Sequence, residues 1–153
     1  MPDFDARAGA ETILSTSSSL LVRTVHDLDK LVFKRIADVL DPHGLSQTQA
    51  LFIIYLGYNT DEAVYQSKLE KAFGLSNPTV TASIRSLVKK GVIYREQDKH
   101  DGRYFQLFLT DYGKTLYAPC IEAFQKADEL FGELLNPEEV ETFRHLLQKL
   151  LQR

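Results

Sequence analysis

The chain has 153 residues, of which 44% are hydrophobic and 25% charged, and its net charge at pH 7 is −3. These values are ordinary for one globular domain and argue against wholesale disorder; the single cysteine, Cys120, excludes an intramolecular disulfide and a zinc framework of four Cys or Cys/His ligands. The first residues lack the basic start and apolar run of a signal peptide, and no apolar stretch approaches the roughly 20 residues that span a bilayer, so we expect a soluble cytoplasmic protein without a membrane partner.

The first 19 residues end in the polar run Ser15-Thr16-Ser17-Ser18-Ser19, which suits a loop or a helix cap. Apolar residues then recur in steps of three or four from Leu21 to Val39, the spacing of one face of a helix about five turns long. Asp41-Pro42-His43-Gly44 ends this helix, because the residue before a proline disfavours the helical region and glycine tolerates positive φ. Ser46 is the expected N-cap of the next helix.

The middle of the chain predicts two short helices followed by a β-hairpin. Tyr65 to Phe73 is a short amphipathic segment, Gly74-Leu75-Ser76 a tight turn, and Ser76 the cap of a helix that ends at Gly91. Residues 92–95 and 104–109 have the character of strands, and the polar residues 96–103 form the loop between them. Two helices joined by a tight turn, followed by a hairpin with a charged tip, make a winged helix-turn-helix.

Charge is unevenly distributed along the chain. Residues 65–103 contain eight basic and four acidic residues, a net charge of +4, whereas the rest of the chain carries −7. This basic island, residues 65–103, can give one face of an otherwise acidic protein a positive electrostatic potential, so the overall charge does not exclude a nucleic-acid partner.

After the hairpin, Thr110 is expected to cap one long helix through Leu134, with Pro119 inside it removing one backbone hydrogen bond and bending it. Residues 136–139 start a final helix that is expected to bury Val140, Phe143, Leu147 and Leu150. Such long apolar-faced helices exceed what a small DNA-binding module needs to cover, and they predict a homodimer. The fold class is therefore mainly α with a small β-hairpin wing. We expect a single unit over residues 1–153, with a DNA-binding lobe at 44–113 and dimerisation helices at 19–41 and 114–153.

The second helix of the pair has the outer face that a DNA-reading helix needs. A helix fits the major groove of B-DNA, so its outer residues must be polar and small enough for close approach. An arginine on the hairpin tip can enter a narrow minor groove, where the negative potential is strongest. The candidate DNA-binding residues are Ser76, Asn77, Pro78, Thr79, Thr81, Ala82, Arg85, Ser86 and Lys89 on the helix, and Lys99, His100, Asp101, Gly102 and Arg103 on the wing.

Four motifs occur in a characteristic order and spacing. They are Gly44-Leu45-Ser46-Gln47-Thr48-Gln49, the stretch from Leu75-Ser76-Asn77-Pro78-Thr79-Val80-Thr81 to Leu87-Val88-Lys89-Lys90-Gly91, the wing sequence Asp101-Gly102-Arg103, and Leu109-Thr110-Asp111-Tyr112-Gly113. In these motifs the sequence resembles the MarR-type (multiple antibiotic resistance) transcriptional regulators. The motifs cover about residues 44–113, and the flanking helices fit the order of the family.

The resemblance implies a homodimeric repressor or activator whose first and last helices interlock. It also implies that residues 76–89 form the recognition helix, that Arg103 is the wing arginine that enters the minor groove, and that Asp101 is the acid that braces it. Two recognition helices in a dimer should lie about 34 Å apart, one turn of B-DNA, and so address a pseudo-palindromic operator. We therefore expect a sequence-specific transcriptional regulator, a repressor rather than an activator, whose affinity for its operator changes when an effector binds.

Other interpretations carry less weight. A winged helix used as a protein-interaction module is the alternative, but it does not need a polar, small-residue helix face beside a basic wing. An enzyme has little support, because the sequence has no Gly-rich phosphate loop, nucleophile motif or clustered acid/base pair, and we expect no cofactor. Cys120 is either an oxidant sensor or, more often for a lone helical cysteine, a small apolar filler. The four histidines are scattered, so no metal site is expected. Whether Tyr55, Tyr58, Tyr117 and Phe124 line an effector pocket or belong to the core stays open.

Overall fold

The chain is mainly helical with one antiparallel β-hairpin, as expected from the sequence. A computed structural model describes residues 5–15 and 20–152. In chain order the elements are α1 (Ala6–Leu14), α2 (Leu21–Leu40), α3 (Gln47–Tyr58), α4 (Gln66–Phe73), α5 (Asn77–Lys89), β1 (Ile93–Gln97), β2 (Phe105–Leu109), α6 (Asp111–Thr115), α7 (Tyr117–Leu134) and α8 (Pro137–Leu151). A short 3₁₀ turn, Asp41–His43, links α2 to the segment before α3.

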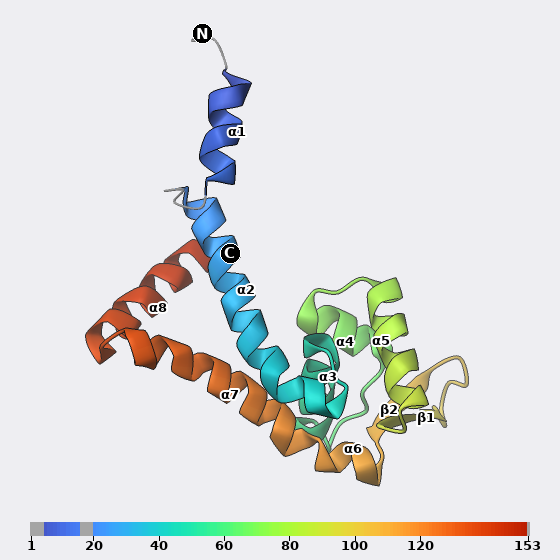
Figure 1. The fold of residues 1–153 in the computed structure, drawn as a ribbon. Coiled ribbons are helices and arrows are strands. Elements are labelled where there is room, and N and C mark those ends of the chain that lie inside the picture. Colours follow the sequence, from blue (N-terminus) through green and yellow to red (C-terminus); the bar gives the residue numbers. More distant parts are fainter. Residues whose placement is uncertain (1–4, 16–19, 153) are drawn as a thin grey trace.

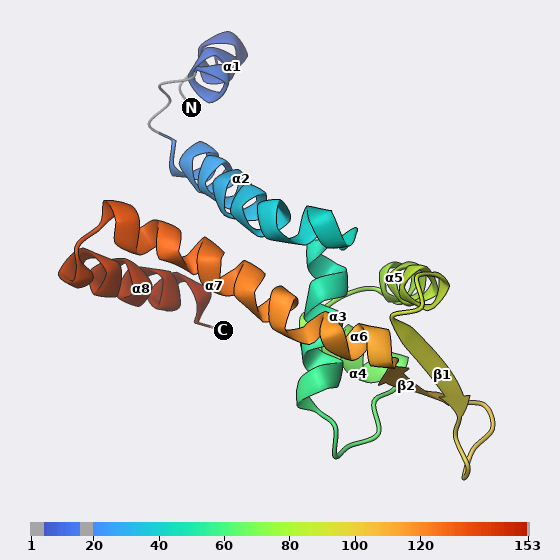
Figure 2. The same ribbon diagram turned by 60° about the horizontal axis from the view of Figure 1, so that its bottom comes forward.

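Two parts of the fold meet at α3. Helices α2 and α7 pack along each other and converge on α3, while α4, α5 and the hairpin lie together on one side (Figure 1). Helix α8 doubles back beside α7 (Figure 2). One continuous apolar core joins the two parts, with Phe52 and Ile53 of α3, Leu87 of α5 and Cys120 of α7 among its fully buried side chains. Helix α5 and the hairpin are thus packed on one common core.

Local chemistry sets the start of each helix in the winged lobe. Ser46 and Gln49 form a reciprocal capping box at the start of α3, in which each side chain accepts a hydrogen bond from the other residue's backbone N–H at 3.1 Å. Gly74, with φ of 60°, ends α4 in the left-handed region that glycine adopts without strain. Ser76 then caps α5, as the sequence predicts.

The hairpin pairs Ile93 with Leu109 at its base and Gln97 with Phe105 at its tip. Strand β1 therefore extends two residues further than expected, and the loop is correspondingly shorter. The segment before α4 joins the sheet from outside, because the N–H of Leu107 donates to the carbonyl of Val64 at 2.8 Å. At the base of the hairpin, Gly113 of α6 lies so close to Val92 that a Cβ there would come within 2.0 Å of the Val92 carbonyl oxygen.

The single long helix expected from Thr110 to Leu134 is wrong. The chain forms two helices there, α6 and α7, separated at Leu116. Pro119 accounts for the interruption: it has no N–H to donate to the carbonyl of Thr115 four residues earlier, and its ring crowds that carbonyl. Thr115 is indeed the last residue of α6. The expected cap at Thr110 is confirmed, since its hydroxyl accepts from the N–H of Gly113 at 2.9 Å.

The final helix is much less buried than expected. Within one chain Val140 and Phe143 are half-buried, whereas Leu150 is 80% exposed and Leu147 is 38% exposed. Helix α8 meets the rest of the chain along α7, where Phe143 packs against Phe131, and within the described part of a single chain Leu150 and Leu151 stay largely exposed. The expectation of burial is therefore wrong for the isolated chain.

The N-terminal region contains a helix that the sequence did not predict. Asp5 caps α1 by accepting hydrogen bonds from the N–H groups of Arg7 and Ala8. This is the same kind of N-cap signal that predicted other helices of the chain, but the apolar periodicity here is too short to have indicated a helix. Of the polar run expected to form a loop or cap, Ser15 is the C-cap of α1, and Thr16 to Ser19 lie outside the described residues.

Candidate nucleic-acid interface

Helix α5 carries most of the candidate residues on a single exposed face. Val80, Ile84 and Leu87 anchor the helix in the core. The opposite face is exposed, and it consists of Ser76, Asn77, Pro78, Thr79, Ala82, Arg85 and Lys89. The Ser76 hydroxyl accepts from the N–H of Thr79 at 3.4 Å and contacts the Thr79 hydroxyl at 2.9 Å. The helix thus presents a capped N-terminus and short polar side chains to the outside.

Thr81 and Ser86 differ from the other candidates on α5, because both are half-buried. The Thr81 hydroxyl accepts from Nε2 of Gln66 at 2.7 Å and lies 3.5 Å from Oδ1 of Asn77. It therefore connects α5 to α4 at the contact between the two helices. This position indicates that Thr81 helps to set the angle between α4 and α5, in addition to being a candidate DNA-binding residue.

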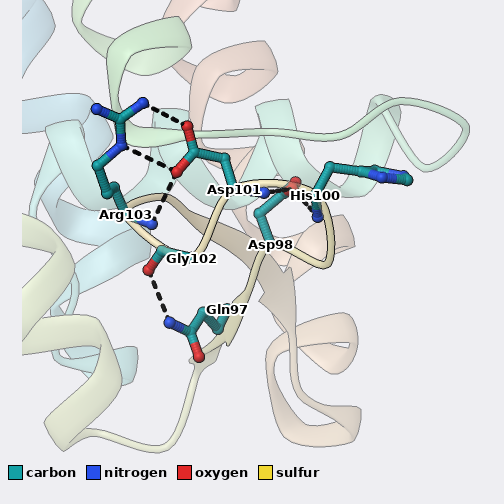
Figure 3. A network of polar contacts seen from close by, with 6 residues as sticks. All are labelled: Gln97, Asp98, His100, Asp101, Gly102 and Arg103. Atoms are coloured by element: carbon teal, nitrogen blue, oxygen red, sulfur yellow. Dashed lines mark hydrogen bonds and ion pairs between the residues drawn. The ribbon is translucent and has the colours of Figure 1, made fainter.

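The wing loop holds Arg103 through Asp101. Nε of Arg103 donates to Oδ1 of Asp101 at 3.0 Å and Nη2 donates to Oδ2 at 2.7 Å, while the backbone N–H of Arg103 also donates to Oδ1 at 3.1 Å (Figure 3). The hydrogen bonds from Arg103 lower the pKa of the Asp101 carboxyl, and the same pair raises the pKa of Arg103. The guanidinium is thus held in one orientation, because a two-point contact restricts both its position and its plane.

Arg103 and His100 lie on different sides of the loop (Figure 3). Arg103 borders a groove of about 430 Å³ between α5 and the wing, together with Asn77 and Thr81. Lys99 and His100 border a separate hollow with Gln106 and Phe108. Of the wing candidates, the structure therefore brings Arg103 towards α5, with Asp101 bound to it, and places Lys99 and His100 elsewhere on the tip. Gly102 lies in the loop, where its carbonyl accepts from Nε2 of Gln97 at 2.7 Å.

Two residues of this region were missed as site residues in the sequence. Arg95 of β1 lines the same groove as Arg103, which adds a second cation beside α5; it was counted in the basic island, but only the strand register shows which way it faces. Asp98 shapes the loop, since its Oδ1 accepts from the backbone N–H of His100 at 2.7 Å and from that of Asp101 at 3.0 Å. An Asp that accepts from amides two and three residues later is an Asx turn, and this signal was available in the sequence.

Lys90, another member of the basic island, serves the fold. Its ammonium donates to the carbonyl of Gly44 and, at 3.1 Å, to Oε1 of Gln49. It thereby connects the C-terminal end of α5 to the turn before α3. The positive charge available on the outer face is accordingly smaller than the charge count suggests.

The aromatic residues left open by the sequence do not share one pocket. Tyr117 lines a cavity of about 410 Å³ between the end of α3, the back of the hairpin and α6, together with Leu56, Tyr94, Phe108 and Lys114. Tyr55 instead packs edge-on against Phe73, with ring centroids 5.8 Å apart, and Phe124 packs against the core. Tyr58 is exposed.

Cys120 is fully buried in α7, and burial raises the pKa of its thiol to about 11. This is the environment of a small apolar filler and not that of a reactive thiolate, which needs exposure and nearby positive charge. Within residues 5–15 and 20–152, no three His, Cys, Asp or Glu side chains converge as they would around a metal ion. None of the helices described there combines the length and apolarity needed to cross a bilayer.

Comparisons with known proteins agree with this architecture. Residues 43–103 match the model of the MarR family. The transcriptional regulator SarZ of Staphylococcus aureus (strain USA300) is 28% identical over 103 residues, which are 67% of this chain and 68% of SarZ. SarZ of Staphylococcus epidermidis (strain ATCC 12228) is 30% identical over 87 residues, 57% of each chain.

Solved structures extend the likeness to most of the chain. The structure of S. aureus MepR in complex with DNA has a TM-score of 0.78 at 23% identity and covers 86% of this chain and 96% of MepR. A mutant of E. coli MarR in complex with operator DNA has a TM-score of 0.74 at 22% identity, with 86% and 94% covered. The winged helix-turn-helix and the helices that flank it are therefore arranged as in these proteins.

Proposed function

We propose that the chain is a transcriptional regulator of the MarR family, whose model matches residues 43–103, and that it binds a specific duplex DNA sequence as a homodimer. The observation that carries the proposal is the exposed, small-residue polar face of α5 beside a wing arginine that is held in one orientation. MepR and E. coli MarR, which share this fold, were each solved in complex with DNA. We propose no catalytic activity for the chain, and we place it in the cytoplasm.

Each part of the interface has a separate task in this proposal. Helix α5 enters the major groove, where Arg85 addresses guanine or a phosphate and the methyl groups of Thr79 and Ala82 touch thymine methyls. The N–H of Asn77 at the start of α5 holds a phosphate, since Pro78 has no N–H and the N–H of Thr79 already donates to Ser76. Arg103 enters the adjacent minor groove of the DNA. Arg95, which lines the protein groove between α5 and the wing, contacts the DNA phosphates between the major-groove and minor-groove sites.

Exposed apolar side chains support the homodimer. Leu21 of α2 is 78% exposed and Leu150 of α8 is 80% exposed, and both belong to helices outside the winged lobe. Burying such residues against a second copy stabilises the dimer, since each fully buried leucine contributes about 1.5–3 kcal/mol. We therefore assign residues 44–113 to DNA binding and residues 19–41 and 114–153 to dimerisation. The two-fold axis then predicts a pseudo-palindromic operator with half-sites about 34 Å apart.

The regulator is proposed to act as a repressor that a small molecule releases. The cavity beside Tyr117 touches both the back of the hairpin and α6, so a ligand there would alter the position of the wing relative to the dimerisation helices. A change in the spacing of the two recognition helices removes the match to the operator. A difference of a few kcal/mol in operator affinity between the two states is enough to empty the site.

Titration of a labelled duplex with matched variants tests the role of α5. Arg85→Ala should weaken binding to the operator by about 1–3 kcal/mol and relax the preference at one base pair of each half-site. Lys34→Ala is the control, because Lys34 is an exposed cation of α2 that pairs with Asp38, outside the winged lobe. Equal effects of the two substitutions would contradict the assignment of α5 as the reading helix.

A further inference from the structure

Asp98 joins the wing loop to the helix-turn-helix. One of its carboxylate oxygens, Oδ1, shapes the loop as described above. The other, Oδ2, accepts from the Tyr65 hydroxyl at 2.5 Å and from Nε2 of Gln106 at 3.1 Å. Tyr65 is the N-cap residue of α4, the first helix of the helix-turn-helix, and lies 33 positions away in the sequence. A single carboxylate therefore binds the loop with one oxygen and the start of α4 with the other.

Tyr65 is itself fixed to the sheet. It forms an isolated β-bridge with Gln106, and its ring packs edge-on against that of Tyr104, with centroids 6.1 Å apart. The guanidinium of Arg103 lies 5.8 Å from the same Tyr104 ring. A continuous series of contacts thus runs from α4 through Tyr65 and Asp98 to the loop that carries Arg103.

The hairpin needs such a contact from outside. A two-stranded hairpin is marginally stable by itself, and its own ladder hydrogen bonds do not fix it relative to the helices. The β-bridge of Tyr65 with Gln106 and its ring contact with Tyr104 hold β2 beside α4, and the Tyr65–Asp98 hydrogen bond extends this attachment to the start of the wing loop. Fixing the tip before binding reduces the entropy that is lost when it is ordered on DNA.

We propose that Tyr65 and Asp98 are positioning residues for DNA binding, which set where Arg103 stands relative to α5 without touching DNA themselves. This inference rests on the proposed function. It also explains why an acidic residue is placed at the mouth of a loop that approaches phosphates, since both oxygens of Asp98 are occupied within the protein. The hydrogen bonds, that from Tyr65 first among them, hold the pKa of Asp98 well below its usual range, and the same bond raises the pKa of Tyr65. Both groups therefore keep the protonation state that the contact needs at neutral pH.

The test compares two hydroxyl deletions on the same protein. Tyr65→Phe removes only the donor to Asp98. Tyr58→Phe is the matched control, because Tyr58 lies at the end of α3 with 79% of its surface exposed, and it lines neither the groove beside the wing nor the cavity beside Tyr117. For the duplex that the wild-type protein selects, Tyr65→Phe should raise Kd at least about fivefold, as expected for one hydrogen bond removed from each protomer. Tyr58→Phe should change Kd by less than about twofold.

A second background separates positioning from general stability. If Tyr65 acts through Arg103, Tyr65→Phe should change Kd by less than about twofold in protein that already carries Arg103→Ala. An equal rise in Kd in both backgrounds, or equal effects of Tyr65→Phe and Tyr58→Phe, would overturn the proposal.

A measurement on the free protein keeps the test independent of DNA. Spin labels on Lys99→Cys in the wing and Lys71→Cys in α4, in a Cys120→Ser background, report the distribution of distances between the two elements. Tyr65→Phe should broaden this distribution and Tyr58→Phe should not. Equal widths in the two variants would refute the contact's positioning role, while failure of the wild-type protein to bind any duplex would refute the proposed function instead.

Discussion

Replacing Gly113 by alanine tests how tightly the base of the wing is packed. A Cβ at position 113 would lie 2.0 Å from the carbonyl oxygen of Val92, whereas real Cβ atoms essentially never approach another heavy atom within 3.0 Å. The backbone must therefore move by about 1 Å. The obstacle is the main chain between α5 and β1, which cannot swing aside as the end of a flexible side chain would.

The cost follows from what that carbonyl does. The Val92 oxygen accepts from the N–H of Thr110 at 3.0 Å and from the Thr110 hydroxyl at 3.1 Å, and these bonds hold the cap of α6 against the start of β1. Overpacking of this kind costs about 1–3 kcal/mol, and a weakened hydrogen bond adds about 1 kcal/mol. A total of about 2–4 kcal/mol corresponds to a fall in Tm of about 5–15 °C for a chain of this size.

Gly132→Ala supplies the matched control, with the opposite sign expected. Gly132 lies in the last turn of α7, and a Cβ there would have nothing within 4 Å. Alanine in an exposed helix position should stabilise the protein by about 0.5–1 kcal/mol. Thermal denaturation followed by circular dichroism, at one protomer concentration, compares the two variants. A Tm for Gly113→Ala within about 1 °C of wild type, or an equal fall for Gly132→Ala, would refute the reasoning.

Three further predictions concern the interface, the thiol and the dimer. Arg103→Ala should weaken duplex binding and, because each protomer then neutralises one phosphate fewer, reduce the slope of log K against log salt by about 2; an unchanged slope in the titration would contradict the wing assignment. Burial raises the pKa of the Cys120 thiol to about 11, so the contribution of this thiol to folding stability is present below its unfolded pKa and is lost as pH rises towards the folded value. At pH 8 the folded protein therefore holds little thiolate, and alkylation of Cys120 should be about 100-fold or more slower than in urea. Equal alkylation rates would be evidence against burial. Leu150→Glu should raise the dimer dissociation constant about 100-fold or more in sedimentation equilibrium, whereas the neighbouring Gln148→Glu should leave it unchanged; the same constant for both would place the dimer contact elsewhere.

The sequence was most informative where structure depends on neighbours along the chain. The caps at Ser46, Ser76 and Thr110, and the turn at Gly74, follow from local chemistry, and the structure confirms each. Together they define the order of helices and strands, which is enough to identify the winged helix-turn-helix.

The sequence was less informative where structure depends on distant contacts. The Tyr65–Asp98 hydrogen bond joins residues far apart in the chain, and no periodicity predicts it. The direction in which Arg95 faces depends on the strand register, and the role of Lys90 depends on the approach of Gly44. The exposure of Leu150 has a different origin, because an apolar helix face can be covered by another copy of the chain as readily as by the chain itself.

Selection of duplexes from a random DNA pool by the purified protein, with affinity then measured at two salt concentrations, tests the central claim most directly. The account predicts enrichment of an inverted repeat with half-site centres about 34 Å apart and affinity that falls steeply with salt. Binding without an enriched sequence would contradict sequence-specific regulation. No binding even at low salt would contradict DNA binding altogether and favour a winged helix that binds another protein.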